Sequence, residues 1–310
     1  MGKLAWEVIE MTRFGFLPTI VLALAIAAFS NQRSATPAPA LLIQTEPKAI
    51  VWIDEIRRGT TDASGTLAIS KLSPGRHTLR VRALGFKETT TPLLPGRKTI
   101  TVKLLSTTDK AELTFQEAEA ARDSARDEAS KEKAAELYRD AITLRPAFPA
   151  AQVGLARLLM DLNQFKEAHA AIDAARRGRP VYPEASAVEG RIFSEEAFTD
   201  QAIRSFRRAI REGNGFQPEA HVGLAKVLEE KGQFDEAIVE FKKAIDQLSD
   251  SEPIIYQMLG AAYEKVEKPK EAVVAYEKYL ELAPNGSYAG AIRSILDQLK
   301  REAAGEQIIP

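Results

Sequence analysis

The sequence predicts a multidomain chain: an N-terminal hydrophobic helix, a small antiparallel β-sandwich and an all-α array of repeated helix pairs. Three observations lead to this prediction: an uncharged apolar run at residues 14–32, short alternating runs between residues 41 and 105, and a helical pattern that recurs every 34 or 35 residues. We expect the segments to be residues 1–32 (hydrophobic segment with flanks), 33–40 (linker), 41–106 (β domain), 107–303 (helical array) and 304–310 (tail).

Composition narrows the classes of function. The 310-residue chain is 45% hydrophobic and 27% charged, which is ordinary for folded protein. Its net charge of −1 at pH 7 argues against a nucleic-acid partner. Because the chain has no cysteine, disulfides, thiolate metal ligands, a cysteine nucleophile and a cysteine-linked lipid anchor are excluded.

The N-terminal apolar run, residues 14–32, is nearly as long as the roughly 20 residues that span a bilayer. We expect an uncleaved signal anchor, because Glu7 and Glu10 are atypical of a cleaved signal. The alternative is a signal peptide cut near the A-x-A run at residues 25–27, followed by secretion. The flanking basic residues favour a single-pass protein of the bacterial inner membrane, with the bulk of the chain periplasmic. The Pro/Ala-rich residues 33–40 read as an extended linker.

Strand-like runs alternate with turn signals in residues 41–105. The runs are LLIQT, AIVWID, HTLRVRA and KTITVKL, separated by Pro-Gly pairs and a glycine. In the third run Leu79 and Val81 face one way, and Arg80 and Arg82 the other. This alternation predicts a half-buried antiparallel sheet within a small sandwich.

A set of turn, small and apolar residues marks the same region: Pro47, Ala49, Val51-Trp52-Ile53-Asp54, Gly59-Thr60, Leu72, Pro74-Gly75, His77, Val81 and Gly85-Phe86. With this pattern the region resembles the PEGA domain of bacterial and archaeal surface proteins, although Pro47-Lys48-Ala49 lacks the acidic residue and the glycine of the namesake motif. The resemblance implies a cell-envelope location and suggests a glycan or cell-wall role. For that role Trp52, if exposed, is the candidate stacking residue; no catalytic residue carries over.

An alanine opens the second helix of each repeated unit, and a bulky apolar residue follows four positions later. The alanines are Ala134, Ala168, Ala202, Ala237 and Ala272, and the bulky residues are Tyr138, Ile172, Phe206, Phe241 and Tyr276. In period and pattern the region resembles the tetratricopeptide repeat (TPR). The resemblance implies stacked helix pairs, with aromatic residues filling the space between repeats. We expect a capping helix at residues 287–302, with Tyr279 meeting it near Tyr288.

Residues that carry catalytic chemistry are scattered. His77, His169 and His221 show no metal-binding spacing, and the chain has no nucleophile elbow, phosphate loop or dinucleotide fingerprint. Gly213-Asn214-Gly215 follows a helix, so it reads as a helix stop rather than a cofactor loop. We therefore expect a non-enzymatic protein with no catalytic residue, cofactor or metal.

The TPR resemblance implies that the first helices line a concave groove that binds a protein or peptide. At one equivalent position of three consecutive first helices the chain places the cations Arg157, Arg191 and Lys226, which suit an acidic peptide or a carboxylate terminus. The alternative is that each cation pairs with the acid four residues later in its own helix: Asp161, Glu195 and Glu230.

Three apolar residues near these cations are candidate groove contacts, with core packing as the alternative: Met160, Val222 and Ile254. Together these features predict an envelope adaptor that binds a protein partner through the groove and reaches the membrane through its N-terminal helix. The alternative is a surface protein that binds a cell-wall glycan through the β domain.

Overall fold

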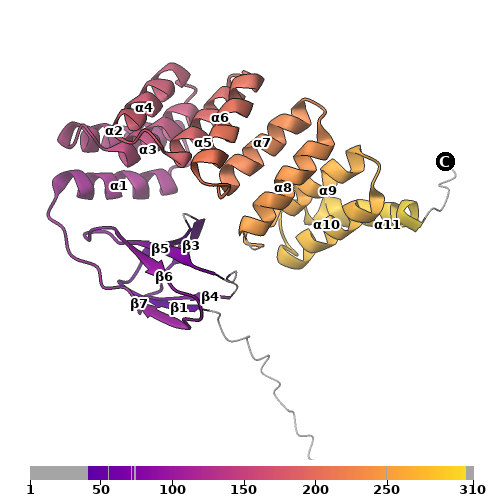
Figure 1. Ribbon diagram of the computed structural model, residues 1–310, viewed down its shortest axis with the longest axis horizontal. Helices are drawn as coiled ribbons and strands as arrows, with labels where there is room; N and C mark the ends of the chain where they lie inside the picture. Colours follow the sequence, from indigo (N-terminus) through magenta and orange to yellow (C-terminus); the bar gives the residue numbers. More distant parts are fainter. Residues whose placement is uncertain (1–40, 55, 71, 73–74, 249, 305–310) are drawn as a thin grey trace, which may run out of the picture. The chain divides into compact units, whose positions relative to one another are not determined.

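The computed structural model describes residues 41–54, 56–70, 72, 75–248 and 250–304 (Figure 1). The predicted hydrophobic segment, the linker and most of the predicted tail lie outside these residues. Among the helices that are described, none has the length and apolar character needed to cross a membrane.

The β region consists of two small sheets, with strand orders β4-β1-β7 and β3-β2-β5-β6. The strands are β1 (Leu41–Gln44), β2 (Ile50–Ile53), β3 (Ile56–Thr60), β4 (Thr66–Ile69), β5 (His77–Arg82), β6 (Thr89–Leu93) and β7 (Thr99–Thr101). The pairing is antiparallel except between β1 and β7, which run parallel with Ile43 opposite Ile100. This corrects the expectation of a fully antiparallel sandwich. Because β7 enters from β6 of the other sheet and not through a hairpin from β1, an antiparallel pairing is not imposed.

The two sheets share one core, to which β1, β2 and β5 contribute fully buried residues. Leu79 and Val81 lie in it, as their alternation predicts. Arg82, expected on the solvent side, is instead buried. Its guanidinium pairs with Glu88 at 2.7 Å and with Glu119 of the first helix at 3.0 Å. Burial alone would lower the pKa of Arg82, but these two carboxylates outweigh it and raise the pKa.

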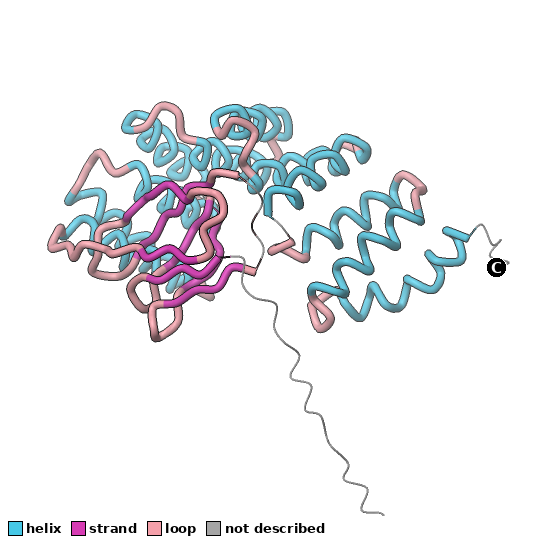
Figure 2. Tube along the Cα trace, turned by 60° about the horizontal axis from the view of Figure 1, so that its bottom comes forward, coloured by secondary structure: helices cyan, strands magenta, loops and turns pink. Residues whose placement is uncertain are grey.

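The helices that follow form consecutive pairs, drawn in cyan in Figure 2 with the strands in magenta. They are α1 (Lys110–Ser124), α2 (Glu128–Leu144), α3 (Pro149–Asp161), α4 (Phe165–Gly178), α5 (Pro183–Glu195), α6 (Thr199–Glu212), α7 (Pro218–Glu230), α8 (Phe234–Leu248), α9 (Ile254–Lys265), α10 (Pro269–Leu282) and α11 (Ala289–Ala304). The first helix of each pair has an odd number and the second an even number, up to α10. The alanines predicted to open the second helices are all fully buried.

Helix boundaries follow local chemistry. Proline begins α3, α5, α7 and α10, where its missing N–H costs no intrahelical bond. The predicted stop after α6 is confirmed: Asn214 and Gly215 have positive φ angles of 52° and 87°, which an α-helix cannot continue.

Aromatic side chains of the second helices fill the space between first helices, as predicted. Phe206 of α6 lies between Gly190 of α5 and Gly223 of α7, where an added Cβ would approach the ring to 2.6 Å and 2.4 Å. Tyr138 of α2 packs on Gly154 of α3, in the next pair, and Tyr276 of α10 packs on Gly260 of α9, in its own pair. Gly154 and Gly223 therefore limit how closely successive pairs approach, and Gly190 and Gly260 limit how closely the two helices of a pair approach.

The last helix, α11, caps the array as expected. The Tyr279 and Tyr288 rings meet edge to face with centroids 6.4 Å apart. The Tyr288 N–H also donates to the Tyr279 hydroxyl at 3.1 Å, and Ile292 is buried against the core. The prediction that Tyr279 meets the cap is therefore confirmed.

We predict that Gly190→Ala destabilises the array by about 1–3 kcal/mol, because Phe206 cannot retreat from a new Cβ while Gly223 closes its other side. The matched control is Gly290→Ala in α11, where a Cβ meets nothing within 4 Å. It is expected to be neutral or to stabilise by up to about 1 kcal/mol. Urea denaturation of both variants tests this, and equal midpoints would contradict the packing argument.

Candidate functional site

The three predicted cations lie on consecutive first helices: Arg157 on α3, Arg191 on α5 and Lys226 on α7. Their exposure rises along the array, from 18% of the Arg157 side chain to 39% of Arg191, and Lys226 is also exposed. The structure brings the two arginines to one carboxylate, that of Glu219 in the first turn of α7.

Glu219 binds Arg157 with both oxygens, at 2.7 Å from Nη1 and 2.8 Å from Nη2. A weaker contact of 3.4 Å joins Arg191 to the same carboxylate, and another of 3.4 Å joins Arg157 to Glu184. The alternative of pairing four residues along the same helix is not what the described residues show. The acids come instead from the first turns of later first helices, Glu184 of α5 and Glu219 of α7.

A repeated tripeptide positions these two acids. Pro183-Glu184-Ala185 begins α5, and Pro218-Glu219-Ala220 begins α7. Proline fixes the first turn, and the positive end of the helix dipole favours a carboxylate beside it. Sequence reasoning missed both glutamates as site residues, although the recurrence of Pro-Glu-Ala in two successive repeats was a readable signal.

Arg157 and Glu219 shift each other's pKa. Burial by itself would raise the pKa of Glu219, but the charge and hydrogen bonds of Arg157 outweigh it and lower the pKa to about 2. The pKa of Arg157 is raised: burial opposes this, and Glu219 and Glu184 prevail. Arg157 is therefore a structural cation whose charge is already neutralised.

Of the three predicted cations on the first helices, Arg191 and Lys226 are the two that a partner can reach. Arg191 makes only the 3.4 Å contact, and in the described part of the chain Lys226 forms no ion pair or hydrogen bond. A partly engaged guanidinium and an exposed ammonium on adjacent first helices can accept a carboxylate from outside.

The apolar candidates divide. Met160 is 3% exposed and lies in the core between repeats, so it is not available to a partner and the packing alternative holds for it. Val222 and Ile254 are half-buried and also lean on the core, with part of each side chain accessible.

Trp52, the candidate for glycan stacking, is half-buried with charge over its ring. The Arg80 guanidinium lies 4.2 Å from the ring centroid, and that of Arg82 lies 5.2 Å away. Stacking arginines occupy the ring as a sugar would, which weakens the case for a glycan there.

Each histidine is bonded to one carboxylate: His77 to Asp54, His169 to Glu196 and His221 to Glu240. Within residues 41–304, apart from the gaps in the description, no group of His, Asp and Glu is arranged to hold a metal ion.

We predict that Glu219→Gln lowers the free energy of unfolding by about 1–2 kcal/mol at pH 7. The effect is smaller than the pKa shift alone implies, because 32% of the carboxylate side chain is exposed and solvent screens the pair. Because the pKa of Glu219 is lower in the folded chain than its ordinary value of 4.5, its ionised carboxylate stabilises the fold at pH values above 4.5. This stabilisation is lost as the pH falls through about 2. Urea denaturation at pH 7, 5 and 3 should show the gap to wild type narrowing. The exposed Glu230→Gln of the same helix should change stability by less than about 0.5 kcal/mol at every pH.

Solved structures of TPR proteins share the fold of the helical region, and two of them serve as examples. One is a thermophilic TPR protein of Thermus thermophilus, 19% identical, with a TM-score of 0.50 over 61% of this chain and 98% of that one. The other is PilF of Pseudomonas aeruginosa, 14% identical, with a TM-score of 0.53 over 63% of this chain and 87% of that one. No curated protein sequence matches the chain.

Sequence profiles of the tetratricopeptide repeat match residues 125–192, 187–253 and 254–285. Together they cover more than half of the chain and coincide with helices α2 to α10. The period, the buried alanines and the ring-on-glycine packing agree with these matches. The chain therefore belongs to the tetratricopeptide-repeat proteins, a family whose repeats serve as scaffolds for protein–protein interaction.

Proposed function

We propose that this protein is a non-enzymatic adaptor of the bacterial cell envelope that binds an acidic segment of a protein partner on its first-helix surface. The observation that carries the proposal is the position of Arg191 and Lys226 on adjacent first helices, with their charges not fully neutralised by the chain itself. Val222 and Ile254 supply partly accessible apolar surface nearby. The half-buried Arg157–Glu219 pair supports the site by linking α3 to the start of α7.

The envelope location rests on the uncharged run at residues 14–32 and on the resemblance of the β region to the PEGA domain. In this proposal the N-terminal run anchors the chain in the inner membrane and the repeats lie on the periplasmic side. The linker at residues 33–40 separates the folded region from the bilayer.

Partner binding is tested by the double variant Arg191→Ala/Lys226→Ala. We expect recovery of the protein partner, by quantitative affinity purification from membranes, to fall about three- to tenfold, the effect of losing two largely exposed ion pairs. The matched control is Lys166→Ala/Lys270→Ala, which removes two exposed lysines from the second helices α4 and α10. Unchanged recovery of the partner, with an unchanged melting temperature, would contradict the proposal that Arg191 and Lys226 bind the partner.

Membrane anchoring is tested separately. Full-length protein should sediment with membranes after a high-salt wash, and a variant lacking residues 14–32 should not. The intact mass of the purified chain distinguishes an anchor from a cleaved signal, because cleavage near residue 27 removes the N-terminal segment. A soluble full-length chain would contradict the anchor.

A further inference from the structure

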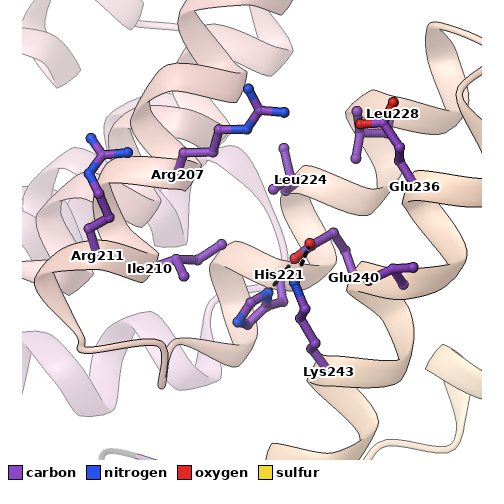
Figure 3. Close-up of a pocket in the computed structure, with 10 residues that line it drawn as sticks. Arg207, Ile210, Arg211, His221, Leu224, Leu228, Glu236, Glu240 and Lys243 are labelled. Carbon is purple, nitrogen blue, oxygen red and sulfur yellow. Dashed lines mark hydrogen bonds and ion pairs between the residues drawn. The ribbon is translucent and has the colours of Figure 1, made fainter.

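A second candidate surface lies on α6, α7 and α8, separate from Arg191 and Lys226. There a pocket of about 370 Å³ opens between the helices. In Figure 3, Arg207 and Arg211 extend from α6 on one side, and Glu236, Glu240 and Lys243 extend from α8 on the other.

The base of this pocket is apolar. Leu224 and Leu228 of α7 are almost fully buried beneath it, and Ile210 of α6 is half-buried against the same core. At the rim, Val239 of α8 remains 49% exposed. A bulky apolar side chain placed here would be removed from water and would cover Val239 and Ile210.

The α6 side of the pocket carries positive charge that the protein does not neutralise. Arg207 and Arg211 are four residues apart on one face of the helix, and both are exposed. In the portion of the chain that is described, neither guanidinium forms an ion pair or hydrogen bond. Their neighbour Arg208, by contrast, donates to Glu212 at 2.6 Å, so α6 pairs Arg208 within the helix and leaves Arg207 and Arg211 open to solvent at the pocket.

The α8 side is already satisfied. The Glu240 carboxylate is bonded to His221 Nδ1 at 2.5 Å and to Lys243 Nζ at 2.7 Å, and His221 Nε2 donates to the Gly215 carbonyl at 3.1 Å. Burial would raise the pKa of Glu240, but the hydrogen bonds from His221 and Lys243 lower it, so this carboxylate stays charged and is already paired. The pocket thus has unpaired cations on its α6 side and a carboxylate with its own donors on its α8 side.

We propose that this pocket binds a protein segment in which one bulky apolar side chain is flanked by carboxylates. The apolar side chain would cover Ile210 and Val239, and the carboxylates would pair with Arg207 and Arg211. A nucleic acid fits less well, because the base of the pocket, formed by Leu224 and Leu228 with Ile210 beside them, is apolar and favours an apolar side chain over a sugar-phosphate chain. This surface is additional to the first-helix site and does not depend on it.

The test selects ligands without bias. Full-length protein in mild detergent is used to select a phage library of random 12-residue peptides, and the recovered peptides are measured by fluorescence anisotropy. We expect sequences with Asp or Glu beside Leu, Ile, Phe or Met. Their affinity should fall about tenfold or more for Arg207→Glu/Arg211→Glu, because each attractive pair becomes a repulsive one.

The matched control is Arg139→Glu/Arg177→Glu. These exposed arginines occupy the same repeat positions on α2 and α4, as Arg207 and Arg211 do on α6. Peptide affinity should be unchanged in this control and in Arg191→Ala/Lys226→Ala, and the melting temperature should be unchanged in the α6 variant. The proposal is overturned if no recovered peptide depends on Arg207 and Arg211. It is also overturned if a 12-nucleotide single-stranded DNA or phosphatidylglycerol vesicles displace the peptides. Peptides that depend only on Arg191 and Lys226 would support the first-helix site and overturn this one.

Discussion

The close contact of an aromatic ring with glycine backbone on neighbouring first helices is the constraint on which the rest of the structure depends. Phe206 fills the space between Gly190 and Gly223 so fully that a single methyl group on either would overlap the ring. Protein interiors pack at crystal-like density, so such a contact sets a distance that the helices cannot relax. Tyr138 on Gly154 repeats the contact between successive pairs, and Tyr276 on Gly260 repeats the contact within a pair, so ring-on-glycine packing recurs along the array.

This spacing determines which charges can meet. With the first helices held this closely, Arg157 of α3 reaches the start of α7, beyond the intervening α5, and binds Glu219 with both terminal guanidinium nitrogens, Nη1 and Nη2. In a half-buried pair with two parallel hydrogen bonds, the attraction between the charges offsets the cost of desolvation better than in a pair with one contact. The same carboxylate then has little capacity left for Arg191. The cationic row read from the sequence is therefore not three equal cations but a graded series, from neutralised to accessible.

Features set by local repetition could be predicted from sequence, and features set by the curvature of the stack could not. Ala134 and its equivalents were found because each is dictated by contacts within its own helix pair. The partners of Arg157 were not found, because they depend on how successive repeats are placed. Glu189 stands where a leucine is usual in the repeat. It accepts hydrogen bonds from Arg176 at 3.1 Å and Ser205 at 2.8 Å, so a polar network replaces an apolar contact.

Strands β3, β4 and β6 were missed because their sequences, IRRGT, TLAI and TTTPL, are too short or too polar to show alternation.

The two candidate surfaces differ in what an incoming carboxylate must displace. At Arg191 it competes with Glu219, which the array cannot release without exposing the charge of Arg157. At Arg207 and Arg211 it displaces only water, because the acids across the pocket are held by His221, Lys243 and Gln233. The first-helix surface therefore favours a partner whose carboxylate fits beside Glu219 and adds to the existing charge network. The α6 surface favours a partner whose carboxylates pair directly with Arg207 and Arg211. Its apolar base adds buried apolar contact, which contributes binding free energy that exposed ion pairs alone do not.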